Sequence, residues 1–173
     1  MSKIVFFCIP AYGHTNPTLG VVRELVARGH EVRYYSYEPM RPLIEAAGAQ
    51  FVACDPYDCE QHLTPADGAR VGKDIAFSTH ILVETTLALD EMVCADMRAY
   101  APDCIVADSM AVWGKAVAKK LGIPFVSSTT TFAFNRYSAK VMKQSGSQML
   151  KMMLAMPKIN RDLQRLRDRG YPI

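Results

Sequence analysis

Two kinds of segment alternate along this chain. Short runs of apolar residues are followed by longer stretches in which an apolar residue recurs every three or four positions. Residues 4–9 (IVFFCI) form an uninterrupted apolar run that stops at Pro10, which is typical of a strand covered on both faces. A loop follows, and Asn16 is expected to cap a helix that has Pro17 in its first turn and ends at Gly29. The first thirty residues therefore predict a strand, a loop and a helix.

The same alternation continues through most of the chain. Further strands are predicted at 31–36, 51–53, 103–108 and 123–127, and further helices at 43–47, 73–99 and 112–121 and from 159 to an end at Gly170. Strands that alternate with helices are joined by right-handed crossovers and run parallel. The pattern predicts an α/β fold, a Rossmann-like, doubly wound parallel sheet. Residues 55–72 interrupt it with the Pro, Gly and Asp content of a long irregular loop.

Composition narrows the class of protein. The chain has 173 residues, of which 50% are apolar and 21% charged, and its mean hydropathy is +0.01. These values exclude intrinsic disorder, and the length excludes two full-sized domains. The sequence contains neither an apolar run of membrane-spanning length nor a secretory signal at its start. We therefore expect no stable membrane insertion and a cytoplasmic location, where the odd number of cysteines, five, would stay reduced.

The last quarter of the chain differs in charge and composition. Residues 136–173 carry a net charge of +7 and the first 135 residues one of −4, while the net charge of the whole chain is +3. We interpret this segment as a solvated helix face and expect no nucleic-acid partner, because no aromatic residues are interleaved in a binding signature. Methionines cluster between Met142 and Met156, and such a cluster either fills a core, the commoner case, or lines an adaptable apolar surface.

Two ionisable residues follow predicted strands at positions where ligands gather in parallel α/β sheets. His14 lies after the first strand and Asp108 ends the fourth, so both are expected at the carboxyl edge. If those strands are neighbours, the carboxylate can accept a hydrogen bond from Nδ1 of the imidazole and leave Nε2 free as a general base. The alternatives are a histidine with only local hydrogen bonds and an aspartate that caps a turn.

Four segments resemble one known family. They are PAYGHTNP at 10–17, LVARGHEV at 25–32, PDCIVAD at 102–108 and LGIP at 121–124. Together they look like the N-terminal half of the macrolide-type glycosyltransferases, members of the nucleotide-sugar-dependent UDP-glycosyltransferase superfamily with the GT-B fold. The resemblance runs from Lys3 to about Ser128 and implies that His14 is the catalytic base and Asp108 its orienting acid.

The resemblance also implies what this chain lacks. Family members have two facing α/β domains, and the motif of the C-terminal, nucleotide-sugar-binding domain is absent from this sequence. Residues 1–173 are therefore expected to form a single acceptor-binding domain, one half of a GT-B architecture, that ends short of its own last strand. A truncated product and one half of a split enzyme both remain open, and the exposed interdomain face would favour self-association.

The implied reaction is inverting sugar transfer from a nucleotide sugar, expected to be a UDP-sugar, to a hydroxyl of a small and largely apolar acceptor. No further cofactor and no metal are expected. Residues expected near the donor phosphates, at the start of the first helix, are Gly13, Thr15 and Asn16. Residues expected to line the acceptor pocket are Phe77, His80, Met110, Trp113, Phe132, Phe134 and Met142.

Other functions find less support in the sequence. A non-catalytic module that binds an acceptor or a protein partner is compatible with the same fold. A dinucleotide-binding domain would use Glu38 on the ribose, but no G-x-G-x-x-G motif follows the first strand. Cys54, Cys59 and His62 suggest a zinc site, which we reject because no fourth ligand follows at a suitable spacing.

Overall fold

A computed structural model describes residues 1–57, 69–71, 73–130 and 146–172. The elements, in chain order, are β1 (Lys3–Phe7), α1 (Tyr12–Ala27), β2 (Glu31–Ser36), the 3-10 turn η1 (Glu38–Met40), α2 (Arg41–Ala46), β3 (Gln50–Ala53), α4 (Ile75–Tyr100), β4 (Cys104–Asp108), α5 (Val112–Leu121), β5 (Phe125–Ser128) and α7 (Gly146–Asp168). The predicted α/β class and most of the predicted elements are confirmed.

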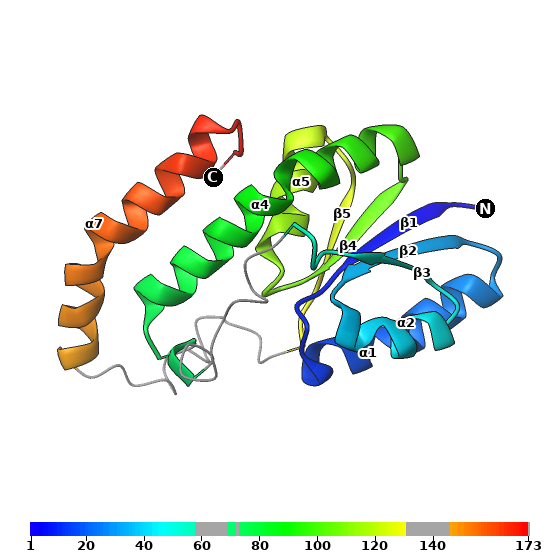
Figure 1. The fold of residues 1–173 in the computed structure, drawn as a ribbon, viewed down its shortest axis with the longest axis horizontal. Helices are drawn as coiled ribbons and strands as arrows, with labels where there is room; N and C mark the ends of the chain where they lie inside the picture. The colour runs from blue at the N-terminus through cyan, green and yellow to red at the C-terminus, as the bar shows by residue number, and fades with distance from the viewer. Residues whose placement is uncertain (58–68, 72, 131–145, 173) are drawn as a thin grey trace.

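The strands form one parallel sheet of five in the order β3-β2-β1-β4-β5. Helices α1 and α2 cover one face and α4 and α5 the other, while α7 packs along the outer side of α4 (Figure 1). The chain moves outward from β1 through β2 to β3, then returns to add β4 on the other side of β1. Strand order therefore reverses between β1 and β4, and the carboxyl ends of these two strands flank the crevice where such sheets bind ligands.

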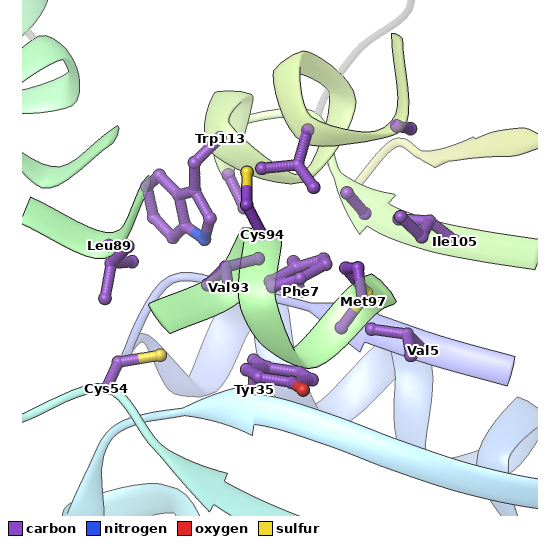
Figure 2. Packing of buried hydrophobic residues seen from close by; sticks show 14 of the residues in the cluster. Val5, Phe7, Tyr35, Cys54, Leu89, Val93, Cys94, Met97, Ile105 and Trp113 are labelled. Carbon is purple, nitrogen blue, oxygen red and sulfur yellow. The ribbon is translucent and has the colours of Figure 1, made fainter. Parts of the chain in front are cut away.

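Alternate residues of β1 enter separate hydrophobic clusters on the two faces of the sheet, as the two-residue period of a strand requires. Phe6 belongs to the cluster under α1 and α2, where its ring stacks on Tyr34 at 5.5 Å. Phe7 belongs to the cluster under α4 and α5, where its ring stacks on Tyr35 at 4.8 Å. Figure 2 shows Phe7 beside Val93 of α4, with Tyr35 below them. Both faces of the sheet are thus packed, which explains the uninterrupted apolar run.

The first helix begins earlier than its sequence signals predict. Asn16 is not the N-cap: α1 starts at Tyr12 after Ala11, and no side chain caps it. The backbone makes the first turn instead, because the N–H groups of His14 and Thr15 both donate to the carbonyl of Ala11 at 2.9 Å. His14 consequently lies within the first turn of α1 rather than in a loop before it.

The last helix is longer than predicted and presents apolar side chains to solvent. It extends over Gly146–Asp168, although the sequence predicted a helix that begins only at about Ile159 and ends at Gly170. Leu150, Met153, Leu154 and Met156 are 58%, 66%, 74% and 42% exposed. In the described part of the methionine-rich segment, these side chains form an apolar surface and not a core. None of the helices in the described ranges has the length and apolar character that crossing a bilayer requires.

A buried carboxylate joins α4, α5 and the segment after α7. Asp90 of α4 accepts hydrogen bonds from Lys120 Nζ at 2.8 Å and from Tyr171 Oη at 2.6 Å, and its side chain is 7% exposed. Burial alone would raise the pKa of Asp90, but the hydrogen bonds from Lys120 and Tyr171 outweigh it and hold the pKa below its usual range. Ionised Asp90 therefore fastens the chain after α7 to the rest of the domain.

Replacing Asp90 by asparagine is expected to lower the free energy of unfolding by about 2 kcal/mol at pH 7, because buried donors lose a charged acceptor. A carboxyl with a lowered pKa in the folded state stabilises above its unfolded pKa, and this stabilisation is lost as the pH falls through the folded value. The difference between Asp90→Asn and the parent chain should therefore shrink below about pH 4. Urea unfolding followed by circular dichroism measures it, with the exposed neighbour in Glu91→Gln as the control.

Candidate active site

His14 and Asp108 meet at the reversal point of the sheet. His14 lies in the first turn of α1, directly after β1, and Asp108 is the last residue of the adjacent β4. His14 Nδ1 lies 2.9 Å from Asp108 Oδ2. The carboxylate side chain is fully buried, while 21% of the imidazole is exposed. The contact expected from the sequence is present, with the imidazole between a buried acid and solvent.

Hydrogen bonds hold the Asp108 carboxylate from two further positions. The N–H of Met110 donates to Oδ2 at 3.2 Å, and the hydroxyl of Thr130 donates to Oδ1 at 3.2 Å. An ionised carboxylate facing Nδ1 favours the tautomer in which Nδ1 carries the proton. The lone pair of His14 is then on Nε2, where the imidazole can accept a proton.

The sequence did not indicate Thr130. It lies two residues after β5, and its Oγ1 is 2.8 Å from His14 Nδ1 as well as within reach of Asp108. The register of β4 and β5 pairs Asp108 with Ser128, so the residues just after β5 lie beside the acid. Only the strand order, which the sequence leaves open, could have singled out Thr130.

The buried side chains that follow His14 in α1, and those that they contact, are uncharged. Thr15 is buried and its hydroxyl donates to Cys8 Sγ at 3.8 Å, while the hydroxyls of Thr18 and Tyr34 are 2.7 Å apart. Burial raises the pKa of the Cys8 thiol to about 11, so Cys8 stays protonated near neutral pH and is not a nucleophile. Of His14 and these buried neighbours, His14 is therefore the residue whose side chain can take up a proton.

The residues expected near the donor phosphates differ in their accessibility. Gly13 and Asn16 are exposed, and nothing lies within 4 Å of a Cβ placed on Gly13. The side chain of Thr15 is buried, so its hydroxyl is not accessible from solvent, and its placement near the donor phosphates stays a prediction. The amides of His14 and Thr15 already bond to Ala11, and we expect the open end of the helix to lie at Tyr12 and Gly13.

Among the residues expected to line an acceptor pocket that the structure describes, Met110 contacts the pair directly. Its side chain is 36% exposed, and its backbone already contacts Asp108. Trp113 is only 1% exposed and belongs to the core under α4 and α5, so its assignment to an open pocket is wrong. Phe132, Phe134 and Met142 lie outside the described residues, as do Cys59 and His62.

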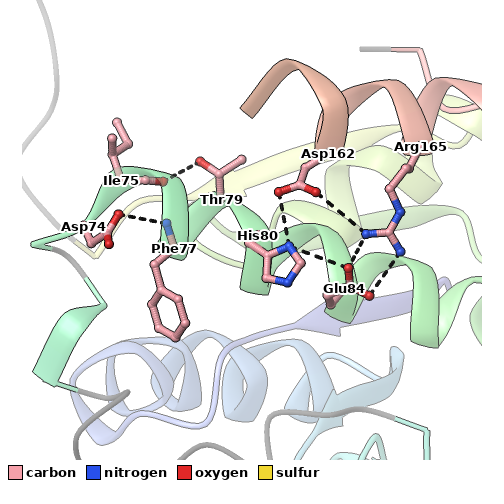
Figure 3. Close-up of polar contacts among 8 residues, drawn as sticks. All are labelled: Asp74, Ile75, Phe77, Thr79, His80, Glu84, Asp162 and Arg165. Atoms are coloured by element: carbon pink, nitrogen blue, oxygen red, sulfur yellow. Dashed lines mark hydrogen bonds and ion pairs between the residues drawn. The ribbon is translucent and has the colours of Figure 1, made fainter. Parts of the chain in front are cut away.

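Phe77 and His80, which were also expected in the pocket, lie on α4 and contact other residues. The guanidinium of Arg70 lies 4.1 Å from the ring centroid of Phe77. His80 Nδ1 lies 3.1 Å from Asp162 Oδ2 of α7 and 3.7 Å from Glu84, in a set of contacts that also includes Arg165 (Figure 3). His80 therefore joins two helices, and the structure gives it no contact with His14.

A separate cavity of about 410 Å³ lies between α4, α5 and α7. Apolar side chains such as Leu82, Val83 and Leu163 line it, with Lys115 and Lys119 on one side. None of the residues expected in the site contributes to this lining. The cavity is therefore distinct from the His14 and Asp108 pair.

Curated proteins similar to this chain are named glycosyltransferases. Demethyllactenocin mycarosyltransferase of Streptomyces fradiae is 36% identical over 149 residues, which are 80% of this chain and 32% of that protein. Oleandomycin glycosyltransferase of Streptomyces antibioticus is 32% identical over 145 residues, 81% of this chain and 32% of that protein. The chain is a homologue of the macrolide and NDP-glycosyltransferases. This glycosyltransferase homologue spans about a third of the length of the curated relatives it matches, and no protein-family model matches it.

Solved structures support the fold of the glycosyltransferase homologue. The glycotransferase of kitacinnamycin matches 99% of this chain and 41% of its own, with a TM-score of 0.71 and 23% identity. Spinosyn rhamnosyltransferase in complexes with thymidine diphosphate and with spinosyn aglycone matches 80% and 81% of this chain and 38% of its own, with TM-scores of 0.58 and 16% identity. The α/β sheet and its helices thus match those of GT-B glycosyltransferases.

Proposed function

We propose that this chain is the acceptor-binding part of an inverting glycosyltransferase, which transfers a sugar from a nucleotide diphosphate sugar to a hydroxyl of a small, largely apolar acceptor. One observation carries the proposal: a partly exposed imidazole is hydrogen-bonded through Nδ1, at 2.9 Å, to a fully buried carboxylate. Such a pair suits general-base catalysis on a hydroxyl near neutral pH. Homology to named glycosyltransferases supports the same reaction.

In the proposed reaction, Nε2 of His14 removes the proton of the acceptor hydroxyl as its oxygen attacks the anomeric carbon of the sugar. The new carbon–oxygen bond forms while the bond to the phosphate oxygen breaks on the opposite face, and the electron pair leaves with the nucleotide diphosphate. Asp108 stabilises the imidazolium that results. Inversion at the anomeric carbon follows from this single displacement.

The donor needs a second binding surface in this proposal. The exposed backbone at Tyr12 and Gly13 begins α1, and the positive end of a helix favours the charge that develops on a leaving diphosphate. We expect the nucleotide itself to be held by a separate nucleotide-sugar-binding domain that faces this edge of the sheet. A UDP-sugar is the expected donor, and a TDP-sugar is the alternative that the nucleotide in the spinosyn rhamnosyltransferase complex suggests.

The function is tested by joining this chain to the donor-binding domain of demethyllactenocin mycarosyltransferase and supplying UDP- and TDP-sugars with macrolide acceptors. We expect a glycoside whose anomeric configuration, read by NMR coupling constants, is opposite to that of the donor. The intact mycarosyltransferase is the positive control. A product that retains the donor configuration would refute the mechanism, and a folded chimera that binds both substrates without transfer would refute the assignment.

A non-catalytic binding module is the second candidate, and the exposed apolar face of α7 favours it. Leu150, Met153 and Leu154 are more than half exposed on successive turns, and an apolar patch of this kind often marks a binding surface. This function requires only that the chain bind an acceptor. Calorimetric titration with macrolide acceptors distinguishes the two, because binding without any transfer in the chimera supports the module.

A further inference from the structure

We propose that Thr130 is a positioning residue, which keeps the proton of His14 on Nδ1 by holding the Asp108 carboxylate in place. The inference concerns the tautomer of His14, and its importance for catalysis rests on the proposed function. Thr130 is the one hydroxyl that the described structure places against both members of the pair, 2.8 Å from His14 Nδ1 and 3.2 Å from Asp108 Oδ1.

The three side chains permit one consistent arrangement of hydrogens. Nδ1 of His14 lies against two oxygens, Asp108 Oδ2 at 2.9 Å and Thr130 Oγ1 at 2.8 Å. A lone pair on Nδ1 would face the ionised carboxylate, so Nδ1 carries the proton and shares it between the two oxygens. The hydroxyl hydrogen of Thr130 is then free to point at Asp108 Oδ1.

Thr130 acts on the tautomer in two ways. Its oxygen accepts from Nδ1–H and so stabilises that tautomer directly. Its hydrogen occupies Oδ1, which has no other partner among the hydrogen bonds of the described residues, whereas Oδ2 also accepts from Met110. Without the hydroxyl, a fully buried carboxylate would keep one oxygen unsatisfied, and it would hold its charge and its orientation less firmly.

The test is a measurement of the His14 tautomer in the 173-residue chain, labelled uniformly with ¹⁵N. The chain has four histidines, and the signals absent from His14→Ala assign the ring. At a pH where the ring is neutral, the ¹⁵N shifts of Nδ1 and Nε2 give the ratio of the two tautomers. We expect the Nδ1–H form to predominate in the parent chain and its ratio to Nε2–H to fall by about twofold to tenfold in Thr130→Val, the range that one hydrogen bond supports.

Matched variants separate the hydroxyl from packing. Thr130→Ser keeps the hydroxyl and should retain the parent ratio, while Thr129→Val changes an exposed neighbour and should leave it unchanged. Thr130→Ala is measured beside Thr130→Val, so that a valine that disturbs folding does not decide the outcome. An unchanged tautomer ratio in a folded Thr130→Ala or Thr130→Val chain overturns the proposal, as does an equal loss in Thr130→Ser.

Failure of the proposed function leaves a different result. In the chimera, the proposal expects Thr130→Val to lower kcat while the KM for the acceptor stays unchanged, with Thr130→Ser near the parent. If no variant transfers sugar but the tautomer still responds to Thr130, the positioning role stands and the glycosyltransferase assignment fails. If transfer depends on His14 but the tautomer ratio does not change in the Thr130 variants, the glycosyltransferase assignment stands and the positioning role fails.

Discussion

Replacing His14 with alanine is expected to lower the kcat of sugar transfer in the chimera by about 10²- to 10⁴-fold, the contribution of a well-placed general base. The acceptor hydroxyl would have to lose its proton to water, because the fully buried Asp108 carboxylate lies on the Nδ1 side of the missing ring, away from the position of Nε2. The KM values should change little, since the imidazole acts on the proton in the transition state. Initial rates measured by product chromatography test this expectation.

Two further variants show whether the loss is specific to the base. His30→Ala removes another histidine, whose Nδ1 accepts from the Ser2 amide at 3.2 Å, and this variant should transfer sugar at the parent rate. Asp108→Asn should lower transfer less than His14→Ala, because the base is still present. Near-normal turnover by His14→Ala would remove the base assignment, whatever the behaviour of Asp108→Asn.

Replacing Gly114 with alanine is expected to destabilise the domain by about 1–3 kcal/mol, the usual effect of an added methyl in a well-packed core. A Cβ at Gly114 would lie 2.7 Å from Ala107 Cβ and 2.9 Å from Phe7 Cδ2. These atoms belong to β4 and β1, so the methyl would push α5 away from the strand that ends in Asp108 and from the strand that precedes the helix carrying His14. Chemical unfolding followed by circular dichroism gives the change in free energy.

Gly20→Ala is the matched control. Gly20 lies in α1, and a Cβ there has nothing within 4 Å. Alanine favours a helix over glycine by about 1 kcal/mol, so this variant should be more stable than the parent, whereas Gly114→Ala gains the same propensity and loses more by overpacking. If the two variants shifted stability equally and in the same direction, close contact between α5 and the sheet would be contradicted.

The sequence predicted the fold well because strands and helices alternate clearly along the chain and the first strand is a continuous apolar run. The strand at 31–36 and the helix at 112–121 have the predicted bounds, since Glu31 and Ser36 bound the strand and Gly122 ends the helix. The start of α1 was wrong, because Asn16 has the side chain of a cap while the turn is made by backbone bonds to Ala11. Hydrogen bonds of that kind depend on chain path and leave no mark in the residue types.

The candidate site was predictable only in part. His14 and Asp108 could be placed at one edge of a parallel sheet from their positions after strands, but their contact depends on β1 and β4 being neighbours. Thr130 needed the further register of β4 with β5. The assignment of Trp113 to the acceptor pocket was wrong for a different reason. With Val117, one turn later, Trp113 lies on the inner side of α5, and its aromatic side chain packs in the core instead of lining an open pocket.

Buried Trp113 gives this chain an internal optical reporter, because it is the only tryptophan in the sequence. Its indole N–H has no hydrogen-bond partner among the residues that the structure describes, and Trp113 is 1% exposed. Its fluorescence should therefore be emitted at short wavelength and move to the red when water reaches the ring. Trp113 lies on the inner side of α5, five residues after Asp108, in the cluster that contains no residue of α1. Its emission is therefore sensitive to that half of the domain. An unchanged spectrum in a His14 or Thr130 variant would therefore show that the strand supporting the acid is still covered.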